Sequence, residues 1–164
     1  MNDRKIKDLV AGIYPLHRTL ASEGTDAALA MVGEYLPRSI SYSIESYAPK
    51  TPVWTWEVPE RYVVHEAYIE LGDGKRIVDF ANNSLHLVSY SLPIDRILAW
   101  DELEPHLHYS VKQPSAIPWM FKYYERDWGF CLSKKTFDAL SREQEFHVVI
   151  RSEFLTGPDQ GVHN

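Results

Sequence analysis

The sequence predicts a mixed α/β (α+β) fold in which two helices and a strand precede a β-rich region with short helices. Apolar residues recur at helical spacing near the start of the chain, and they alternate along residues 39–46. After residue 50, strand-like runs and turn signals dominate. The 164 residues, 45% of them hydrophobic, are enough for one ordinary core or for one core with an appended lobe.

Two amphipathic helices are predicted at the start of the chain. Residues 3–16 carry apolar side chains at i, i+3, i+4 and i+7, and Tyr14-Pro15 ends this helix. A loop follows over residues 16–24. The second helix is expected over residues 25–36, with Thr25 or Asp26 as its N-cap.

Residues 39–46 alternate strictly between apolar and polar side chains. This pattern predicts a strand with Ile40, Tyr42 and Ile44 on one half-buried face. Pro49 and Pro52 then bracket a linker-like break. A new structural part is therefore expected to begin at about this point.

The β-rich region is expected to begin with a hairpin of residues 64–71 and 76–80, in which Asp73-Gly74 supplies the positive φ angles of the turn. Two short helices are predicted: a capping box at Asp101 precedes residues 102–107, and Ser133 caps the other helix. The remaining predicted elements are strands at 85–90, 94–98, 128–132 and 145–150, the capped helix at 134–140 and an unstructured tail at 156–164.

A long irregular loop over residues 109–126 is rich in proline and aromatic side chains. So many large rings must pack against something, so the loop either wraps over the sheet or lines a pocket. This favours one candidate function, a free-standing module that binds a small ligand or a peptide through residues 117–128.

Three residues are candidates for facing a substrate: Arg18, His86 and Tyr90. In the predicted strand at 85–90, His86 and Tyr90 point to the same side, about 13 Å apart, and present an imidazole and a phenol. The alternative is that His86 is half-buried and bonds to a backbone carbonyl. Arg18 precedes the second helix, where it either pairs with a substrate anion or forms a surface salt bridge.

Other reactive side chains suggest no complete catalytic site. His106 and His108 have the spacing of a strand-borne metal pair, but no third ligand follows, and imidazoles also favour a helix end. Cys131 lies in an apolar run and is expected to be a buried hydrophobe rather than a nucleophile. We therefore assign no catalytic residue, no metal ligand and no cofactor to this chain.

Charge and hydropathy exclude several classes of protein. A net charge of −6 and a pI of about 5.6 argue against a nucleic-acid-binding protein, and no polybasic stripe favours a membrane surface. No apolar run approaches the roughly 18 residues that span a bilayer. A cytoplasmic protein is expected, in agreement with the single cysteine.

The chain carries a series of motifs in one order: Tyr14-Pro-Leu-His-Arg18 with Glu23-Gly24, Trp54-x-Trp-x-Val-Pro59, Ala67-Tyr-Ile69, Ile77-Val-Asp-Phe80, Asn83-x-Leu-His-x-Val-Ser-Tyr-Ser91, Pro105-His-Leu107, Gln113-Pro-x-Ala-Ile-Pro118 and Trp128-Gly-Phe-Cys131. This series resembles a bacterial aminopeptidase-like family. Members resemble co-catalytic zinc aminopeptidases with an inserted β-rich domain of unknown function.

The resemblance implies that the chain is the N-terminal part of such a protein. It implies a fragment of the peptidase layer at 1–48, the inserted domain at 49–151 and a tail at 152–164. In the family the zinc ligands follow the insert, so the resemblance implies zinc for the intact protein but none here. The implied partners are the missing C-terminal peptidase portion and a small-molecule or peptide substrate, and the chain alone is expected to be inactive.

Overall fold

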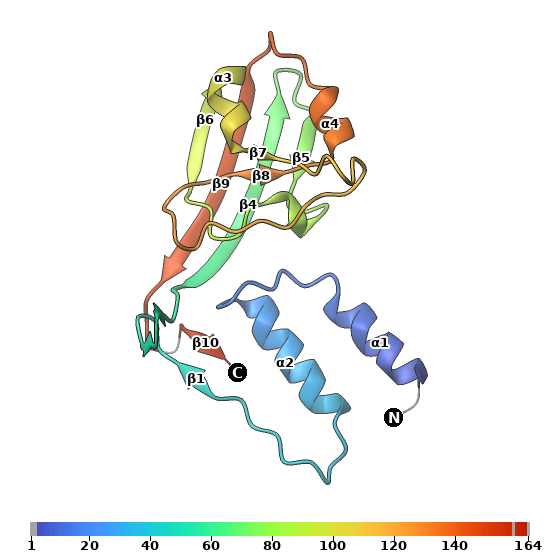
Figure 1. Ribbon diagram of the computed structural model, residues 1–164, viewed down its shortest axis with the longest axis vertical. Coiled ribbons are helices and arrows are strands. Elements are labelled where there is room, and N and C mark those ends of the chain that lie inside the picture. The colour runs from blue at the N-terminus through green and yellow to red at the C-terminus, as the bar shows by residue number, and fades with distance from the viewer. Residues whose placement is uncertain (1–2, 159, 164) are drawn as a thin grey trace. The chain divides into compact units, whose positions relative to one another are not determined.

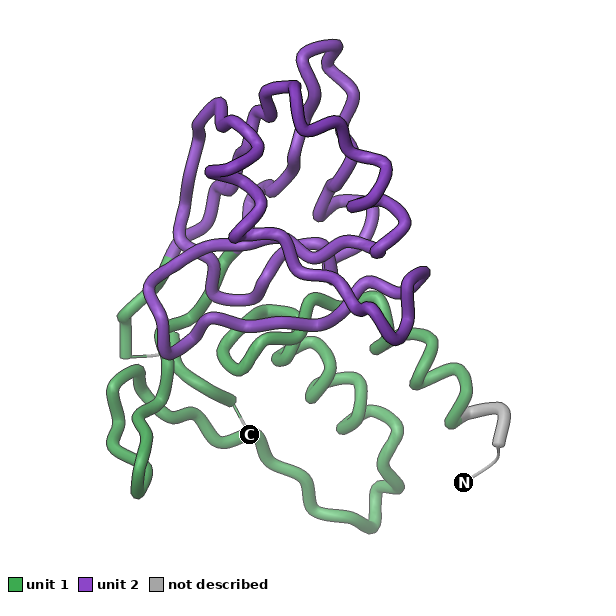
Figure 2. The backbone as a smooth tube through the Cα atoms, turned by 45° about the horizontal axis from the view of Figure 1, so that its top comes forward, with its two compact units in different colours: residues 1–63, 154–164 green, residues 64–153 purple. Residues whose placement is uncertain are grey.

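The computed structural model describes residues 3–158 and 160–163 and has an α+β fold. The chain divides into two compact units (Figure 2). Unit 1 comprises residues 1–63 and 154–164, and unit 2 comprises residues 64–153. The two ends of the chain thus build one unit, and its continuous middle builds the other.

Both helices of unit 1 confirm the prediction. Helix α1 spans Asp3–Ile13 and α2 spans Glu23–Tyr35. The N-cap of α2 is Ser22, not Thr25 or Asp26 as predicted, because the Ser22 hydroxyl accepts the Thr25 N–H at 3.3 Å. Gly12 lets the helices approach, since a β-carbon there would lie 2.5 Å from the Met31 methyl group.

The strand predicted over residues 39–46 is wrong for most of its length. Only β1 (Ser46–Tyr47) is paired, with β10 (Val162–His163), and residues 41–45 run without a ladder partner in the described chain (Figure 1). The alternating sequence suits a strand, but no neighbouring strand is present to complete it. Because β10 is formed, the tail is not wholly unstructured as predicted; residues 159 and 164 lie outside the described residues.

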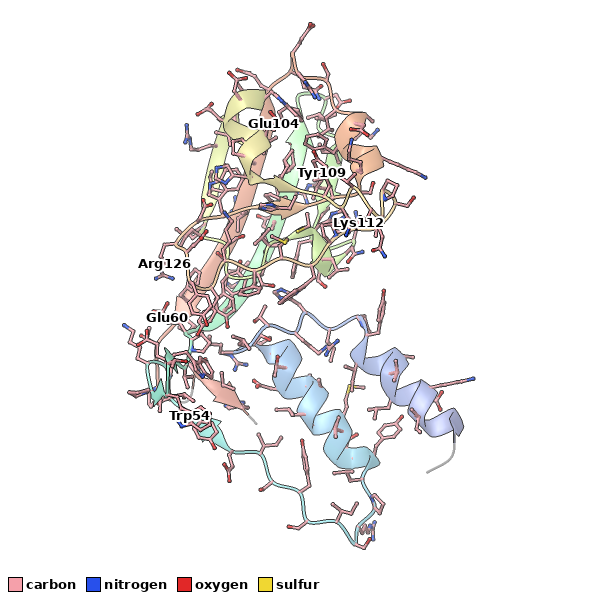
Figure 3. All side chains as sticks on the ribbon, in the orientation of Figure 1. Trp54, Glu60, Glu104, Tyr109, Lys112 and Arg126 are labelled. Carbon is pink, nitrogen blue, oxygen red and sulfur yellow. The ribbon has the colours of Figure 1, made fainter. Side chains whose placement is uncertain are left out.

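A small hairpin completes unit 1. Strands β2 (Pro52–Val53) and β3 (Trp56–Glu57) pair antiparallel. Trp54 lies in the turn between them, is fully exposed, and has a φ of +50°, which is rare for a bulky residue (Figure 3).

The main sheet has the strand order β5-β4-β9-β6 (Figure 1). Strands β4 and β5 form the predicted hairpin, although only Gly74 of the turn has a positive φ. Strands β6 and β9 pair antiparallel, with Leu98 opposite Phe146. The strand bounds are Arg61–Leu71 for β4, Arg76–Asp79 for β5, Ile94–Leu98 for β6 and Phe146–Leu155 for β9.

One face of this sheet forms the core of unit 2. Ile69 pairs with Val78 and Leu98 with Phe146, and all four side chains are buried. Alternate residues of β4 and β9 carry charges on the opposite face, as expected for an antiparallel sheet with one solvated side. Burial of these apolar side chains supplies most of the stabilisation of the unit.

Short elements cover the core. Helix α3 (Trp100–Leu103) begins before the predicted capping box at Asp101, because Glu102 instead accepts the Ala99 N–H at 3.4 Å. Ser133 caps α4 (Lys134–Asp138) as predicted, accepting the Thr136 N–H at 3.0 Å. The other short elements are the 3₁₀ turn η2 (Glu104–His106) and the parallel strands β7 (Leu107–His108) and β8 (Phe130–Cys131).

The strand predicted at 85–90 is also wrong. Ser84–His86 form the 3₁₀ turn η1, which Asn83 caps by accepting the Leu85 N–H at 3.0 Å. Tyr90 has a φ of +65°, outside the β region. His86 and Tyr90 therefore do not share one face of a strand. Within residues 3–158 and 160–163, no helix is long and apolar enough to cross a membrane.

Candidate functional site

The three predicted substrate-facing residues have different environments. Arg18 lies exposed in the loop between α1 and α2, in unit 1. In unit 2, His86 is half-buried and its Nδ1 donates to the Cys131 carbonyl at 2.7 Å, as the alternative interpretation expected. Tyr90 is buried, with its ring 5.7 Å from that of Tyr123. Contact of these residues with a substrate stays a prediction.

The strongest candidate site in unit 2 is the segment at 117–128, which we call the aromatic loop. Backbone hydrogen bonds attach this loop to the segment that contains Ser89. The Ser89 N–H donates to the Met120 carbonyl at 3.0 Å, and the Lys122 N–H donates to the Ser89 carbonyl at 2.9 Å. A third backbone hydrogen bond runs from the Leu92 N–H to the Asp127 carbonyl at 2.9 Å. The loop is irregular, but its backbone is well supported.

Large rings on this supported loop remain accessible. Trp119 is 59% exposed and Tyr124 is 75% exposed. The Trp119 and Phe121 rings lie 5.1 Å apart, and the Tyr123 and Tyr124 rings lie 4.2 Å apart. In Figure 3, Lys112 and Arg126 mark the two ends of the stretch that carries these rings. Such rings offer apolar faces to a ligand, with hydrogen-bonding groups close by.

Charged side chains hold the end of the loop. Lys122 forms an ion pair with Asp127, whose second oxygen lies 3.5 Å from His106 Nδ1. Burial alone would raise the pKa of Asp127, but the Lys122 ammonium and the Trp128 N–H hold it below its usual range. The His106 ring stacks on Trp128 at 3.8 Å and donates to its carbonyl at 3.0 Å.

His108 and His106 do not have the surroundings of metal ligands. Nε2 of His108 is buried and has no hydrogen-bond partner among the residues that the structure describes, and burial, aided by the Lys122 charge, lowers the pKa of His108. Across the part of the chain that the structure describes, no three His, Cys, Asp or Glu side chains are grouped to hold a metal ion. His106 and His108 therefore do not fit a zinc site, and no catalytic role for a metal is assigned to them.

Cys131 is positioned as a core residue. Its side chain is fully buried in β8, and burial raises the pKa of the thiol to about 12, partly opposed by a hydrogen bond from the Met120 backbone. The reactive thiolate is therefore scarce at neutral pH. A hydrolase that depends on Cys131 is disfavoured.

Unit 2 also has a shallow depression of about 480 Å³ that the sequence did not reveal. The charges around it already have partners: His65 contacts Glu153 at 2.9 Å, and Asp95 contacts His147 at 2.8 Å. The depression arises where β6 pairs with β9, and such long-range pairing has no local sequence signal. It is lined by His65, Pro93, Ile94, Asp95, Ile150, Arg151, Ser152 and Glu153.

Known proteins resemble nearly the whole chain. A curated relative from Clostridium acetobutylicum, provisionally named a polysaccharide biosynthesis protein with an aminopeptidase-like domain, is 31% identical over 153 residues. That match covers 93% of this chain and 34% of the relative. A crystal structure of a protein from the same organism, provisionally named a peptidase, is 29% identical with a TM-score of 0.86. It matches 98% of this chain, which spans 36% of that protein.

The family comparison agrees with the position of unit 2. The family model described as a domain of unknown function, DUF2172, matches residues 61–153. Those residues include the whole main-sheet core and the aromatic loop, and they make up more than half of the chain. The two Clostridium proteins link the same region to peptidase-like proteins. The chain therefore belongs to the DUF2172 family.

Proposed function

We propose that this chain is the N-terminal, non-catalytic portion of an aminopeptidase-like zinc hydrolase. In this proposal a separate peptidase portion, in the same polypeptide or in a second one, holds the zinc and acts on a small-molecule or peptide substrate. The chain spans about a third of the two Clostridium proteins, whose names supply the peptidase class. The zinc chemistry rests on the sequence resemblance alone.

The observation that carries the proposal is an uncovered apolar stripe on α1. Ile6 and Val10 lie four residues apart on the helix, and Tyr14 directly follows its last residue and donates its N–H to the Val10 carbonyl at 2.9 Å. The three residues are 40%, 58% and 78% exposed. An amphipathic helix normally buries such a stripe against a core. No described residue of α2 is fully buried either. Exposed apolar surface of this extent is typical of an interface, and here the peptidase portion is the proposed occupant.

The first test compares isolated and fused protein. The purified chain alone is expected to hold no stoichiometric zinc by elemental analysis and to release no product from aminoacyl p-nitroanilides. A chimera in which this chain replaces the matching region of the Clostridium relative is expected to be folded. Stoichiometric zinc or turnover by the isolated chain would contradict the non-catalytic assignment.

Two matched substitutions locate the interface. In the chimera, Val10→Glu is expected to lower the free energy of unfolding by about 1–3 kcal/mol, because it buries an unpaired charge. In the isolated chain the same change should have little effect, since Val10 is already exposed. Val111→Glu, at an exposed valine of unit 2, is the control and should change neither protein. Equal effects of Val10→Glu in both contexts would show that the stripe stays uncovered.

A second candidate function is a binding module that uses the aromatic loop for a small ligand or a peptide. The exposed rings of Trp119 and Tyr124 favour it. Because the Clostridium relative carries a polysaccharide-related name, maltopentaose and tetra-alanine are suitable probes of the two chemistries. Quenching of tryptophan fluorescence measures their binding. Trp119→Ala is expected to weaken binding at least about 10-fold, or about 1.4 kcal/mol.

The control for this experiment is Trp54→Ala, which removes another exposed tryptophan, in unit 1. It should leave the dissociation constant unchanged. If neither probe binds, or if both substitutions have the same effect, the aromatic loop is not the binding surface for these ligands.

A further inference from the structure

The unpaired segment of unit 1 has a self-complementary sequence. Residues 40–44 read Ile-Ser-Tyr-Ser-Ile, which is the same in both directions about Tyr42. In a two-fold symmetric pair of antiparallel strands, each residue faces its mirror position in the second copy. Centred on Tyr42, this register places Ile40 opposite Ile44 and Ser41 opposite Ser43. Like side chains then meet on both faces of the pair.

The backbone of residues 41–45 is free to pair, whereas the Ile40 N–H already donates to the Pro37 carbonyl at 2.9 Å. Residues 41–45 belong to no helix or strand, and among the described residues none of their backbone groups forms a backbone hydrogen bond. Ile40 and Ile44 are exposed. An extended segment with unpaired N–H and C=O groups and accessible β-branched side chains is a template for another strand.

Contacts with α2 hold the segment in place. The Tyr42 hydroxyl donates to the Leu29 carbonyl at 2.8 Å. The Tyr42 ring lies so close to Gly33 that a β-carbon there would approach it to 2.6 Å. At its other end the segment enters β1, which is paired. The edge is therefore already ordered, so little conformational entropy is lost when it pairs.

The charges at the ends of the segment do not oppose pairing. Residues 39–44 carry no charge, and they are flanked by Arg38 and Glu45. In the register centred on Tyr42, Arg38 lies opposite Ser46 and Glu45 lies opposite Ser39. No like charges therefore face each other.

We propose that residues 39–45 pair antiparallel with the same residues of a second copy of this chain, centred on Tyr42, and so form a two-fold symmetric dimer. This inference goes beyond the proposed function. A second copy and a peptidase portion that covers this edge exclude one another. The dimer is accordingly a state of the uncovered chain.

Sedimentation equilibrium of the full chain tests the dimer. Between about 1 and 200 µM, the average mass is expected to rise from 19.0 kDa towards twice that value. Ile44→Lys places a lysine opposite Ile40 at both ends of the pair, and we expect a dissociation constant at least about 10-fold higher. A mass of 19.0 kDa at every concentration would overturn the proposal.

The matched control is Ile97→Lys, at an exposed isoleucine on the edge strand β6 of unit 2. It should leave the dissociation constant unchanged; if it abolishes association instead, the interface lies on β6. Circular dichroism of each variant separates loss of pairing from loss of fold. Zinc content and turnover, which test the proposed function, do not depend on this mass measurement, so the two proposals fail separately.

Oxidative cross-linking tests the register. The double variant Ser41→Cys with Ser43→Cys is expected to form a covalent dimer, because the two positions face each other across the two-fold axis. Ser39→Cys should not, since its partner is Glu45. Cys131 is buried and gives little background. Efficient linkage through Ser39→Cys but not through the double variant would refute the Tyr42-centred register.

Discussion

Asp26→Asn is expected to lower the free energy of unfolding by about 2–4 kcal/mol, because it removes the partner of a buried arginine. Arg61 Nη2 lies 2.5 Å from Asp26 Oδ2, and the Arg61 side chain is only 11% exposed. The other oxygen of Asp26 lies 2.7 Å from His163 Nδ1. One carboxylate thus joins α2 to the start of β4 and to β10, and its loss leaves the guanidinium uncompensated.

Chemical denaturation at neutral pH measures this effect. Glu23→Gln is the control, because Glu23 is an exposed acid in the same first turn of α2 and has the same helix-dipole contribution. We expect it to cost less than about 1 kcal/mol. Equal costs for the two substitutions would assign the effect to the helix dipole instead of to Arg61.

The second large effect is a loss of stability in acid caused by His17. Burial lowers the pKa of His17 from 6.5 to about 4. Between these values the unfolded chain binds a proton that the folded chain does not. The contribution of His17 is therefore fully present above pH 6.5 and is lost as the pH falls to about 4. The difference corresponds to about 3 kcal/mol.

His17→Gln isolates this contribution. The difference in unfolding free energy between the wild type and the variant is expected to change by about 3 kcal/mol between pH 7 and pH 4, with the wild type losing more stability. His65→Gln, at an imidazole with 53% side-chain exposure, is the matched control. Parallel pH profiles for the wild type and His17→Gln would contradict the burial of His17 as the cause.

Local sequence patterns predicted the elements that depend on local interactions. The spacing of Ile6, Leu9 and Ile13 predicted α1, the turn at Gly74 predicted the β4–β5 hairpin, and Ser133 marked the start of α4. Each signal lies within a few residues of the structure it specifies. That is why these predictions are confirmed.

Errors arose where long-range partners or specific backbone angles decide the structure. Residues 39–46 have a strand pattern, but ladder pairing needs a neighbour that the described chain does not provide. The segment with His86 and Tyr90 alternates in sequence, yet the Asn83 cap and the positive φ of Tyr90 prevent a strand. Alternation describes how side chains are distributed, but it does not guarantee a hydrogen-bonded partner.

The candidate site was predicted in composition but not in geometry. The composition of residues 117–128 identified the aromatic loop, although rings such as Trp119 are more exposed than the expected packing implied, and the carbonyl bond of His86 was among the alternatives considered. The pairing of Ser89 with Met120 and Lys122, which fixes the loop, could not be foreseen. The same holds for the ion pair between Lys122 and Asp127, since both depend on contacts between distant segments.

The discontinuous make-up of unit 1 has a consequence for biosynthesis. Its last strand, β10, and His163 leave the ribosome after every residue of unit 2 has been translated. We therefore expect unit 2 to gain native contacts first during translation, while α1 and α2 await their C-terminal partners. During that interval Asp26 of α2 still lacks its contact with His163.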